Sequence, residues 1–172
     1  KIVEHCERAS VPMRTLPGIK DLPSGRAGFS SLREISIEDL LGREPVSLDW
    51  EVIAAGIEGQ TVLITGGGGS IGAELCRQIG KLNPQRLVIY DASEFNVYQI
   101  ERGLRTLLPE LTIHALLGDV CDRARLQQVF SEFKPSLVLH AAAYKHVPML
   151  ENQARQAVRN NVLGTRETTA AA

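Results

Sequence analysis

Beyond residue 60 the chain alternates short apolar runs with longer amphipathic ones. The short runs are rich in Val, Ile and Leu and have the length of strands that are buried on both faces. The four predicted strands lie within TVLIT (61–65), RLVIYD (86–91), LTIHALLGD (111–119) and SLVLHAAA (136–143). This alternation predicts an α/β fold of the Rossmann type, a doubly wound parallel sheet covered by helices on both faces.

The predicted helices cover residues 71–82, 94–108, 122–133 and 149–160. In the first three, apolar residues recur every three or four positions, so one face is expected to point toward the sheet. The residues on these faces are Ile71, Leu75 and Ile79; Val97, Ile100, Leu104 and Leu107; and Leu126, Val129, Phe130 and Phe133. Ser93 is the expected N-cap of the second helix. Asn160 and Asn161 are expected to end the fourth.

We predict that residues 59–172 form a nucleotide-binding Rossmann domain that stops before its catalytic portion. Residues 1–58 have a different pattern of apolar and polar positions. A helix end at IVEHC and a strand in VPMRTLP precede a loop rich in Gly, Pro and Ser. A short helix follows in SIEDLLG, with Ser36 as cap and Gly42 as stop. We interpret residues 1–58 as the tail of an upstream αβ domain and a linker. An extension packed on the main sheet is the alternative.

Charge and composition exclude several classes of function. The 172 residues carry a formal net charge of −1, which disfavours nucleic-acid binding through a basic face. No apolar run approaches the roughly 20 residues of a membrane-spanning helix, so this stretch is expected not to contact a membrane. The three cysteines lack C-x-x-C spacing and predict free thiols, and no metal site is expected. The start at Lys1 and the end in TTAAA favour a fragment of a longer protein.

The most informative stretch is TGGGGSIG (65–72), which follows a predicted strand and opens a predicted helix. Glycines at such a junction permit a tight turn, close approach of a pyrophosphate and close helix packing, while the helix start holds the phosphate charge. The motif fits G-x-G-x-x-G on Gly67, Gly69 and Gly72, or T-G-x-x-G-x-x-G beginning at Thr65. The candidate cofactor-binding residues here are Thr65, Gly66, Gly69, Ser70, Ile71 and Gly72.

An acid at the end of the second predicted strand indicates which dinucleotide binds. Asp91 lies 22 residues after Gly69, where a carboxylate accepts hydrogen bonds from ribose hydroxyls and repels a 2′-phosphate. This position favours NAD over NADP. The alternative is a helix-capping role for Asp91 in the DAS turn.

Two further segments extend the predicted cofactor site. Asp119 and Val120 follow the third strand and are candidates for contact with the adenine, although Asp119 also fits a turn before the next helix. Ala141, Ala142 and Ala143 end the fourth strand, where small side chains let a flat cofactor pass close to the main chain. Core packing is the alternative explanation for the alanines.

Five segments together resemble the extended short-chain dehydrogenase/reductase superfamily, and more closely its CapD-like polysaccharide-biosynthesis proteins. They are TGGGGSIGAELCRQI, YDASEFNVYQIE, GDVCDRARLQQVF, KPSLVLHAAAYKHVPMLE and AVRNNVLGTRE. The resemblance covers about residues 30–172. It implies an NAD(P)-dependent nucleotide-sugar 4,6-dehydratase acting on a UDP-linked N-acetylhexosamine, or a related epimerase. It further implies a homo-oligomeric, membrane-anchored parent protein at the cytoplasmic face of the bacterial inner membrane.

The chain departs from this family at the catalytic residues. Neither the Ser/Thr-Asp-Lys stretch nor the Tyr-x-x-x-Lys pattern of the superfamily occurs, so the main acid and base are expected beyond residue 172 and the fragment is expected to be inactive alone. By resemblance, Lys145 and His146 line the sugar-nucleotide side and are the weak local candidates for catalysis. Solvated loop residues are the alternative for both.

The resemblance also implies that an Asn in NVLGT (161–165) holds the loop after the fourth strand, whereas a plain C-cap is equally physical. Three functional alternatives remain open from the sequence. They are a dehydratase, a 4-epimerase or 4-reductase, and a non-catalytic NAD(P)-sensing module.

Overall fold

The computed structural model describes residues 14–15, 33–34 and 48–172, and it divides into two compact units, residues 1–48 and 49–172. In the first unit, strands β1 (Arg14–Thr15) and β2 (Arg33–Glu34) pair antiparallel. β1 lies within the strand predicted in VPMRTLP, and β2 was not predicted. The helix end predicted at IVEHC and the short helix in SIEDLLG lie outside the described residues.

The second unit is built on a four-stranded parallel sheet. Its strands lie where the apolar runs placed them. They are β3 (Thr61–Thr65), β4 (Arg86–Asp91), β5 (Ile113–Leu117) and β6 (Leu137–His140). Three helices connect successive strands, namely α4 (Ser70–Gly80), α5 (Glu94–Leu107) and α6 (Arg123–Phe133). The predicted α/β fold is therefore confirmed.

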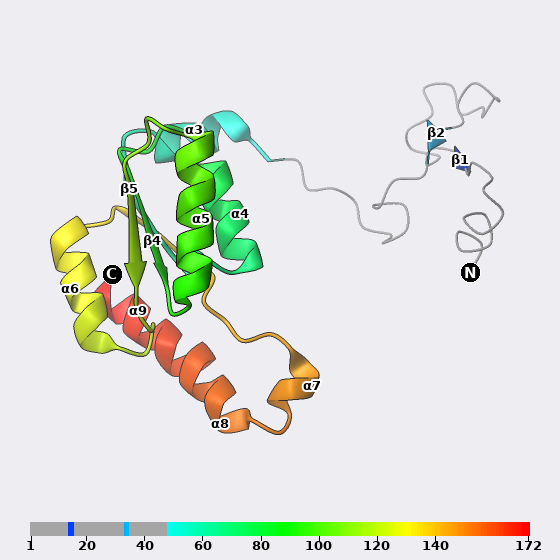
Figure 1. The fold of residues 1–172 in the computed structure, drawn as a ribbon, viewed down its shortest axis with the longest axis vertical. Coiled ribbons are helices and arrows are strands. Elements are labelled where there is room, and N and C mark those ends of the chain that lie inside the picture. Colours follow the sequence, from blue (N-terminus) through cyan, green and yellow to red (C-terminus); the bar gives the residue numbers. More distant parts are fainter. Residues whose placement is uncertain (1–13, 16–32, 35–47) are drawn as a thin grey trace. The chain divides into compact units, whose positions relative to one another are not determined.

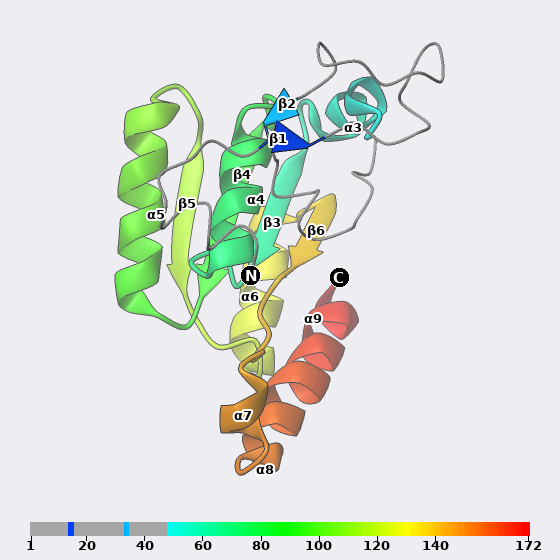
Figure 2. The same ribbon diagram turned by 90° about the vertical axis from the view of Figure 1, so that its right-hand side faces the viewer.

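The strand order is β5-β4-β3-β6, as Figure 2 shows from left to right. The chain runs outward from β3 to β4 to β5, and α6 then returns it to the other side of β3. The direction of winding thus reverses between β3 and β6. In open α/β sheets, ligands bind at the carboxyl ends of the strands on either side of such a reversal.

Side chains alternate between the two faces of the sheet, and each face has its own core. Helices α4 and α5 cover one face and α6 covers the other (Figure 1). Val62, Ile64, Leu87 and Ile89 pack with Cys76 and Ile79 of α4 and with Ile100 and Leu104 of α5. On the opposite face, Leu63, Val88 and Tyr90 pack with Leu126, Val129 and Phe133 of α6. Burial of both faces explains why the strands are almost continuously apolar.

The compact unit begins at Asp49, before the predicted boundary at residue 59, because a helix that we did not predict lies there. Helix α3 (Trp50–Ile57) is capped by Asp49, whose side chain accepts from the amide of Val52. Ile57 is 4% exposed and joins the core cluster of α4 and α5. The signal in the sequence is weak, since α3 has eight residues and only Ile57 is fully buried.

Two residues predicted to face the sheet are exposed instead. Ile71 is 64% exposed in the first turn of α4, and Leu107 is 53% exposed in the last turn of α5. Ile71 is the second residue of α4, and Leu107 is the last residue of α5. The helical repeat therefore gave the wrong direction for these two terminal residues, whereas it was right for Ile79 and Phe133, which also lie in terminal turns and are buried.

The helix predicted over residues 149–160 is wrong in extent. Two short helices, α7 (Val147–Leu150) and α8 (Ala154–Ala157), are followed without a break by a π-helical segment η3 (Val158–Gly164) and by α9 (Thr165–Ala171). Asn160 and Asn161 therefore lie inside the helical run and do not cap its end. Gly164 does not stop the helix, and a Cβ there would lie 2.6 Å from Cγ2 of Val120.

Two of the predicted free thiols are confirmed. Cys76 is buried and Cys121 is partly buried, and neither forms a disulfide. Burial raises the pKa of the Cys76 thiol to about 12. Cys6 lies outside the described residues. Among the described helices, none combines the length and apolar character needed to cross a bilayer.

Replacing Gly72 by Ala should destabilise the fold by about 1–3 kcal/mol, because the added Cβ would clash with the carbonyl of Gly66, which cannot move freely. Gly103 of α5 is the matched control, since its Cβ would meet open space. Gly103→Ala should stabilise by about 0.5–1 kcal/mol through helix propensity. Urea unfolding of both variants tests this expectation, and equal effects would contradict it.

If α3 belongs to the folded unit, Ile57→Ala should lower the free energy of unfolding by about 2–4 kcal/mol by leaving a cavity. Val52 lies on the same helix but is 67% exposed, so Val52→Ala should change stability by less than about 0.5 kcal/mol. Thermal or urea unfolding gives both values. A small effect at both positions would show that α3 is dispensable.

Candidate functional site

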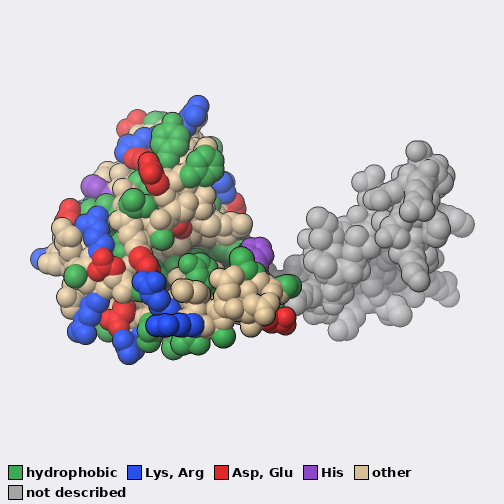
Figure 3. Space-filling view, turned by 60° about the horizontal axis from the view of Figure 1, so that its bottom comes forward, with side chains coloured by type: hydrophobic (Ala, Val, Ile, Leu, Met, Phe, Trp, Pro, Cys, Tyr) green, Lys and Arg blue, Asp and Glu red, His purple; other side chains and the backbone are tan. Residues whose placement is uncertain are grey.

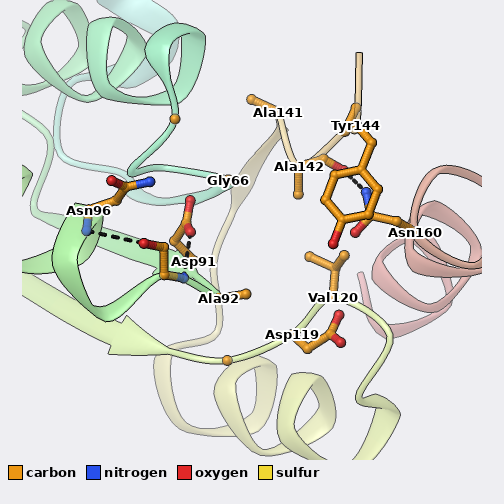
Figure 4. Close-up of a pocket in the computed structure, with 14 residues that line it drawn as sticks. Gly66, Asp91, Ala92, Asn96, Asp119, Val120, Ala141, Ala142, Tyr144 and Asn160 are labelled. Atoms are coloured by element: carbon orange, nitrogen blue, oxygen red, sulfur yellow. Dashed lines mark hydrogen bonds between the residues drawn. The ribbon is translucent and has the colours of Figure 1, made fainter. Parts of the chain in front are cut away.

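A cavity of about 420 Å³ lies at the carboxyl edge of the sheet, at the reversal between β3 and β6 (Figure 4). The segments that follow all four parallel strands contribute to its wall, together with one residue each from α5 and η3. The lining residues are Gly66, Gly69, Asp91, Ala92, Ser93, Asn96, Gly118, Asp119, Val120, Ala141, Ala142, Ala143, Tyr144 and Asn160. We call this space the first cavity.

The turn after β3 depends on main-chain contacts that need glycine. Gly66 has φ +67°, and its amide donates to the carbonyl of Tyr90 at 2.8 Å. A Cβ on Gly66 would lie 2.5 Å from the amide nitrogen of Ala142. The absent side chain therefore lets the turn after β3 and the segment after β6 come together at one side of the first cavity.

The start of α4 carries amides without partners. Helices α3, α5 and α6 are each capped by a side chain, whereas Gly69 at the N-cap of α4 has none to offer. Within the described residues, the amides of Ser70, Ile71 and Gly72 make no hydrogen bond, and Ala73 is the first to bond back, to Gly69. Three free N–H groups and the positive end of the helix dipole make this start suited to an anion.

Most amides of the glycine run itself are used internally. Gly67 also donates to the Tyr90 carbonyl, at 3.3 Å, and Gly69 donates to the Gly66 carbonyl at 3.0 Å. The amide of Gly68 donates to Oδ2 of Asp91 at 3.0 Å. The run therefore builds the turn, and the residues after it supply the free donors.

Asp91 lies between the glycine turn and α5, as Figure 4 shows. Its Oδ2 accepts from Gly68, and its Oδ1 accepts from the amide of Ser93 at 2.9 Å. Ser93 in turn caps α5 by accepting from Asn96. A carboxylate has about four acceptor positions, so two amides leave capacity for a ligand hydroxyl. The cap of α5 is thus Ser93, not Asp91, and Asp91 supports it while keeping acceptor capacity for a ligand.

The segment after β5 is held in place by Tyr90, a fully buried residue of β4. Its hydroxyl donates to the carbonyl of Asp119 at 2.9 Å, and its ring lies against Gly118, where a Cβ would clash. Burial raises the pKa of Tyr90 to about 12, so the hydroxyl keeps its proton. Asp119 accepts from the amide of Cys121 and pairs with Arg159 at 3.4 Å.

The wall after β6 is held by the two asparagines of η3. Asn161 makes two hydrogen bonds to the main chain of Tyr144, accepting from its amide at 2.8 Å and donating to its carbonyl at 2.9 Å. Asn160 donates to the carbonyl of Ala142 at 3.3 Å. Of the two roles considered for these asparagines, the structure therefore has them holding the loop after β6, not capping a helix.

Lys145 and His146 lie in a neighbouring space of about 580 Å³, which we call the second cavity. Ala143 and Tyr144 line both cavities. The remaining residues of the second cavity are Met149, Leu150, Gln153 and Gln156. Lys145 and His146 are both exposed and do not line the first cavity.

Eight of the predicted cofactor residues line the first cavity, and four do not. The four are Thr65, Ser70, Ile71 and Gly72. Thr65 is fully buried, and its hydroxyl lies 2.6 Å from Nδ1 of His140. Contact of these four with a dinucleotide stays a prediction, which for Ser70, Ile71 and Gly72 is carried by their free amides.

Six further residues line the first cavity and were not predicted to belong to the cofactor site. They are Ala92, Ser93, Asn96, Gly118, Tyr144 and Asn160. Asn96 had a usable signal, because it is a polar residue in the first turn of the helix that follows Asp91. It packs against Gly68, whose Cβ would lie 2.5 Å from that of Asn96. Asn160 had no such signal, since its position depends on the unpredicted path of η3.

Known proteins resemble this chain both in sequence and in fold. The family model described as polysaccharide biosynthesis protein matches residues 62–172. The chain is 39% identical over its whole length to the capsular polysaccharide biosynthesis protein CapD of Staphylococcus aureus, of which it spans 29%. It is 29% identical over 62% of its length to a UDP-N-acetylglucosamine 4,6-dehydratase (inverting) of Campylobacter jejuni, of which it spans 30%.

Solved structures agree with these relatives. The crystal structure of UDP-glucose-4-epimerase from Stenotrophomonas maltophila, with bound NAD and formylated UDP-arabinopyranose, superposes with a TM-score of 0.56 at 27% identity. The match covers 65% of this chain and 33% of the epimerase. Its relatives are thus nucleotide-sugar dehydratases and epimerases, and the chain belongs to the polysaccharide biosynthesis protein family.

Proposed function

We propose that this chain binds NAD in the first cavity as the cofactor-binding part of a nucleotide-sugar 4,6-dehydratase of the UDP-N-acetylhexosamine type, in bacterial surface polysaccharide biosynthesis. The observation that carries the proposal is the pairing of an uncapped helix start with a carboxylate at the same sheet edge. The free amides of Ser70, Ile71 and Gly72 fit a pyrophosphate. Asp91, across the glycine turn, fits the ribose hydroxyls.

The charges around the first cavity favour NAD over NADP. A 2′-phosphate beside the Asp91 carboxylate would be repelled. Arg159, the basic residue paired with Asp119, is already engaged at the other end of the cavity. On the face drawn in Figure 3, acidic and basic side chains are interspersed, so local donors rather than a basic patch must hold the phosphates.

The remaining wall suits a flat ligand. Ala141, Ala142 and Ala143 carry small side chains along one side of the cavity, and Val120 lies beneath them in Figure 4. The Asp119–Val120 segment, held by Tyr90, supports an adenine at this end. When bound, NAD would supply the capacity to accept a hydride from the sugar and return it. The chain's own residues would bind and orient it.

The second cavity is the proposed place of the sugar nucleotide, because it shares Ala143 and Tyr144 with the first and adds two basic side chains. Lys145 supplies a cation for a diphosphate or a developing oxyanion, and His146 supplies an imidazole for acid or base chemistry. The principal acid and base are proposed to lie outside this stretch, in the longer membrane-anchored, homo-oligomeric protein. The chain spans less than a third of the length of the relatives reported above.

Replacing Asp91 by Arg should weaken NAD binding by tenfold or more and raise the affinity for NADP relative to NAD, because the repulsion of a 2′-phosphate becomes attraction. Titration of both dinucleotides by fluorescence or calorimetry measures the ratio. Glu110→Arg is the matched control for charge, since Glu110 lies in the loop that leads into the opposite end of β5. Asp91→Asn tests whether loss of the carboxylate alone weakens NAD. An unchanged NAD/NADP ratio in Asp91→Arg would reject the role of Asp91.

The substrate class is tested on the longer protein with UDP-N-acetylglucosamine. A dehydratase should release one water and give a 4-keto-6-deoxy sugar, which mass spectrometry detects as the loss of that water. An epimerase should give the 4-epimer with unchanged mass, which chromatography separates. Absence of both products, with NAD binding intact, would instead favour the sensing module.

A further inference from the structure

His140, the last residue of β6, lies at the centre of a chain of hydrogen bonds that ends at Tyr144, a residue of both cavities. Its Nδ1 lies 2.6 Å from the hydroxyl of Thr65, and its Nε2 lies 3.0 Å from the hydroxyl of Thr165. Thr65 ends β3 immediately before the glycine turn, and Thr165 begins α9. One imidazole ring therefore joins the start of the proposed phosphate site to the helical run that contains η3.

The direction of each hydrogen bond follows from the chemistry of the last acceptor. The Thr165 hydroxyl lies 2.7 Å from the carbonyl oxygen of Asn161. A carbonyl can only accept, and a hydroxyl has one hydrogen to donate, so Thr165 donates to Asn161. Thr165 must then accept from His140, which places a hydrogen on Nε2. In the neutral ring Nδ1 is consequently an acceptor, and Thr65 donates to it.

This order makes the Nε2–H tautomer the one form of His140 that satisfies all three groups. Thr65 is fully buried, and His140 is its hydroxyl's hydrogen-bond partner within the described residues. A hydrogen on Nδ1 would leave the Thr65 hydroxyl hydrogen without that acceptor, and an unsatisfied buried donor costs free energy. The residue retains access to solvent, yet partial burial of its ring lowers the pKa of His140, which also favours the neutral form.

The far end of this chain reaches the wall between the cavities. Asn161, whose carbonyl accepts from Thr165, holds both main-chain groups of Tyr144 with its side chain. Tyr144 lines the first and the second cavity. The connection thus runs from Thr65 through His140 and Thr165 to Asn161 and Tyr144, with neutral donors and acceptors in sequence.

We infer that His140 is a positioning residue, which as the Nε2–H tautomer couples the glycine turn to the η3 segment that holds Tyr144 between the two cavities. This inference rests on the proposed function for the identity of the ligands but not for the coupling itself. Its consequence is that breaking the His140–Thr165 bond loosens Tyr144 and weakens dinucleotide binding, although Thr165 lines neither cavity.

The tautomer is tested directly on the whole chain labelled with nitrogen-15 in histidine. Nitrogen NMR at neutral pH should give His140 an unprotonated Nδ1 and a protonated Nε2. The reverse tautomer, or an equal mixture, would overturn the assignment. This measurement needs no ligand, so it is independent of whether the chain binds NAD.

The coupling is tested with Thr165→Val, which keeps the shape of the side chain and removes its hydroxyl. The Thr165 hydroxyl bonds both to His140 and to the Asn161 carbonyl, and its removal should accelerate amide hydrogen exchange at Tyr144 about fivefold or more and weaken NAD binding by a similar factor. Thr165→Ser restores the hydroxyl and should return both values toward those of the unmodified chain. Thr169→Val is the matched control, because Thr169 makes the same bond one turn later, to the carbonyl of Thr165, and makes no hydrogen bond to His140 within the described residues.

The outcomes separate the two proposals. Faster exchange at Tyr144 in Thr165→Val, but not in Thr169→Val, supports the coupling even if NAD fails to bind any of the variants. Exchange at Tyr144 that is unchanged in Thr165→Val, or equally raised in Thr169→Val, overturns it even if NAD binds tightly.

Discussion

The close contact between the Gly66 carbonyl and the start of α4 determines much of this structure. Because Gly72 has no Cβ, the first turn of α4 can rest directly on the turn that leaves β3. The helix axis then points its free amides at the carboxyl edge of the sheet. The two bonds from Gly66 and Gly67 to the carbonyl of Tyr90 attach the same turn to β4. The phosphate-binding geometry is therefore a result of how the helix packs on the strand, and no separate loop has to be positioned.

The neighbouring walls depend on the same strands. Tyr90 accepts from the glycine turn with its carbonyl and donates to the segment after β5 with its hydroxyl. One buried residue therefore holds two sides of the first cavity in place. The segment after β6 meets Gly66 on one side and the asparagines of η3 on the other. Each of these walls is thus a main-chain segment held at a strand end.

The sequence predicted the strands and the glycine turn well, because both depend on local properties. Continuous Val, Ile and Leu indicate a strand with two covered faces, and glycines between a strand and a helix indicate a turn that a ligand approaches. The same reasoning failed at α3, where one fully buried side chain, Ile57, gives too little periodicity. It also failed after residue 149, because Asn160 and Asn161 suggest a helix end, whereas their side chains instead bond to the segment after β6 and the helix continues past them.

Half of the fourteen residues that line the first cavity are glycine or alanine, and its proposed phosphate donors are main-chain amides, so this part of its recognition chemistry is invisible to alanine scanning. Truncating a side chain cannot remove an amide at Ser70 or Ile71, and Ala141 to Ala143 are already truncated. The main-chain part of this wall is instead sensitive to an added atom, since a Cβ at Gly66 or Gly72 would clash with neighbouring backbone. For this part of the site, enlargement of a glycine rather than deletion of a side chain is the informative kind of substitution.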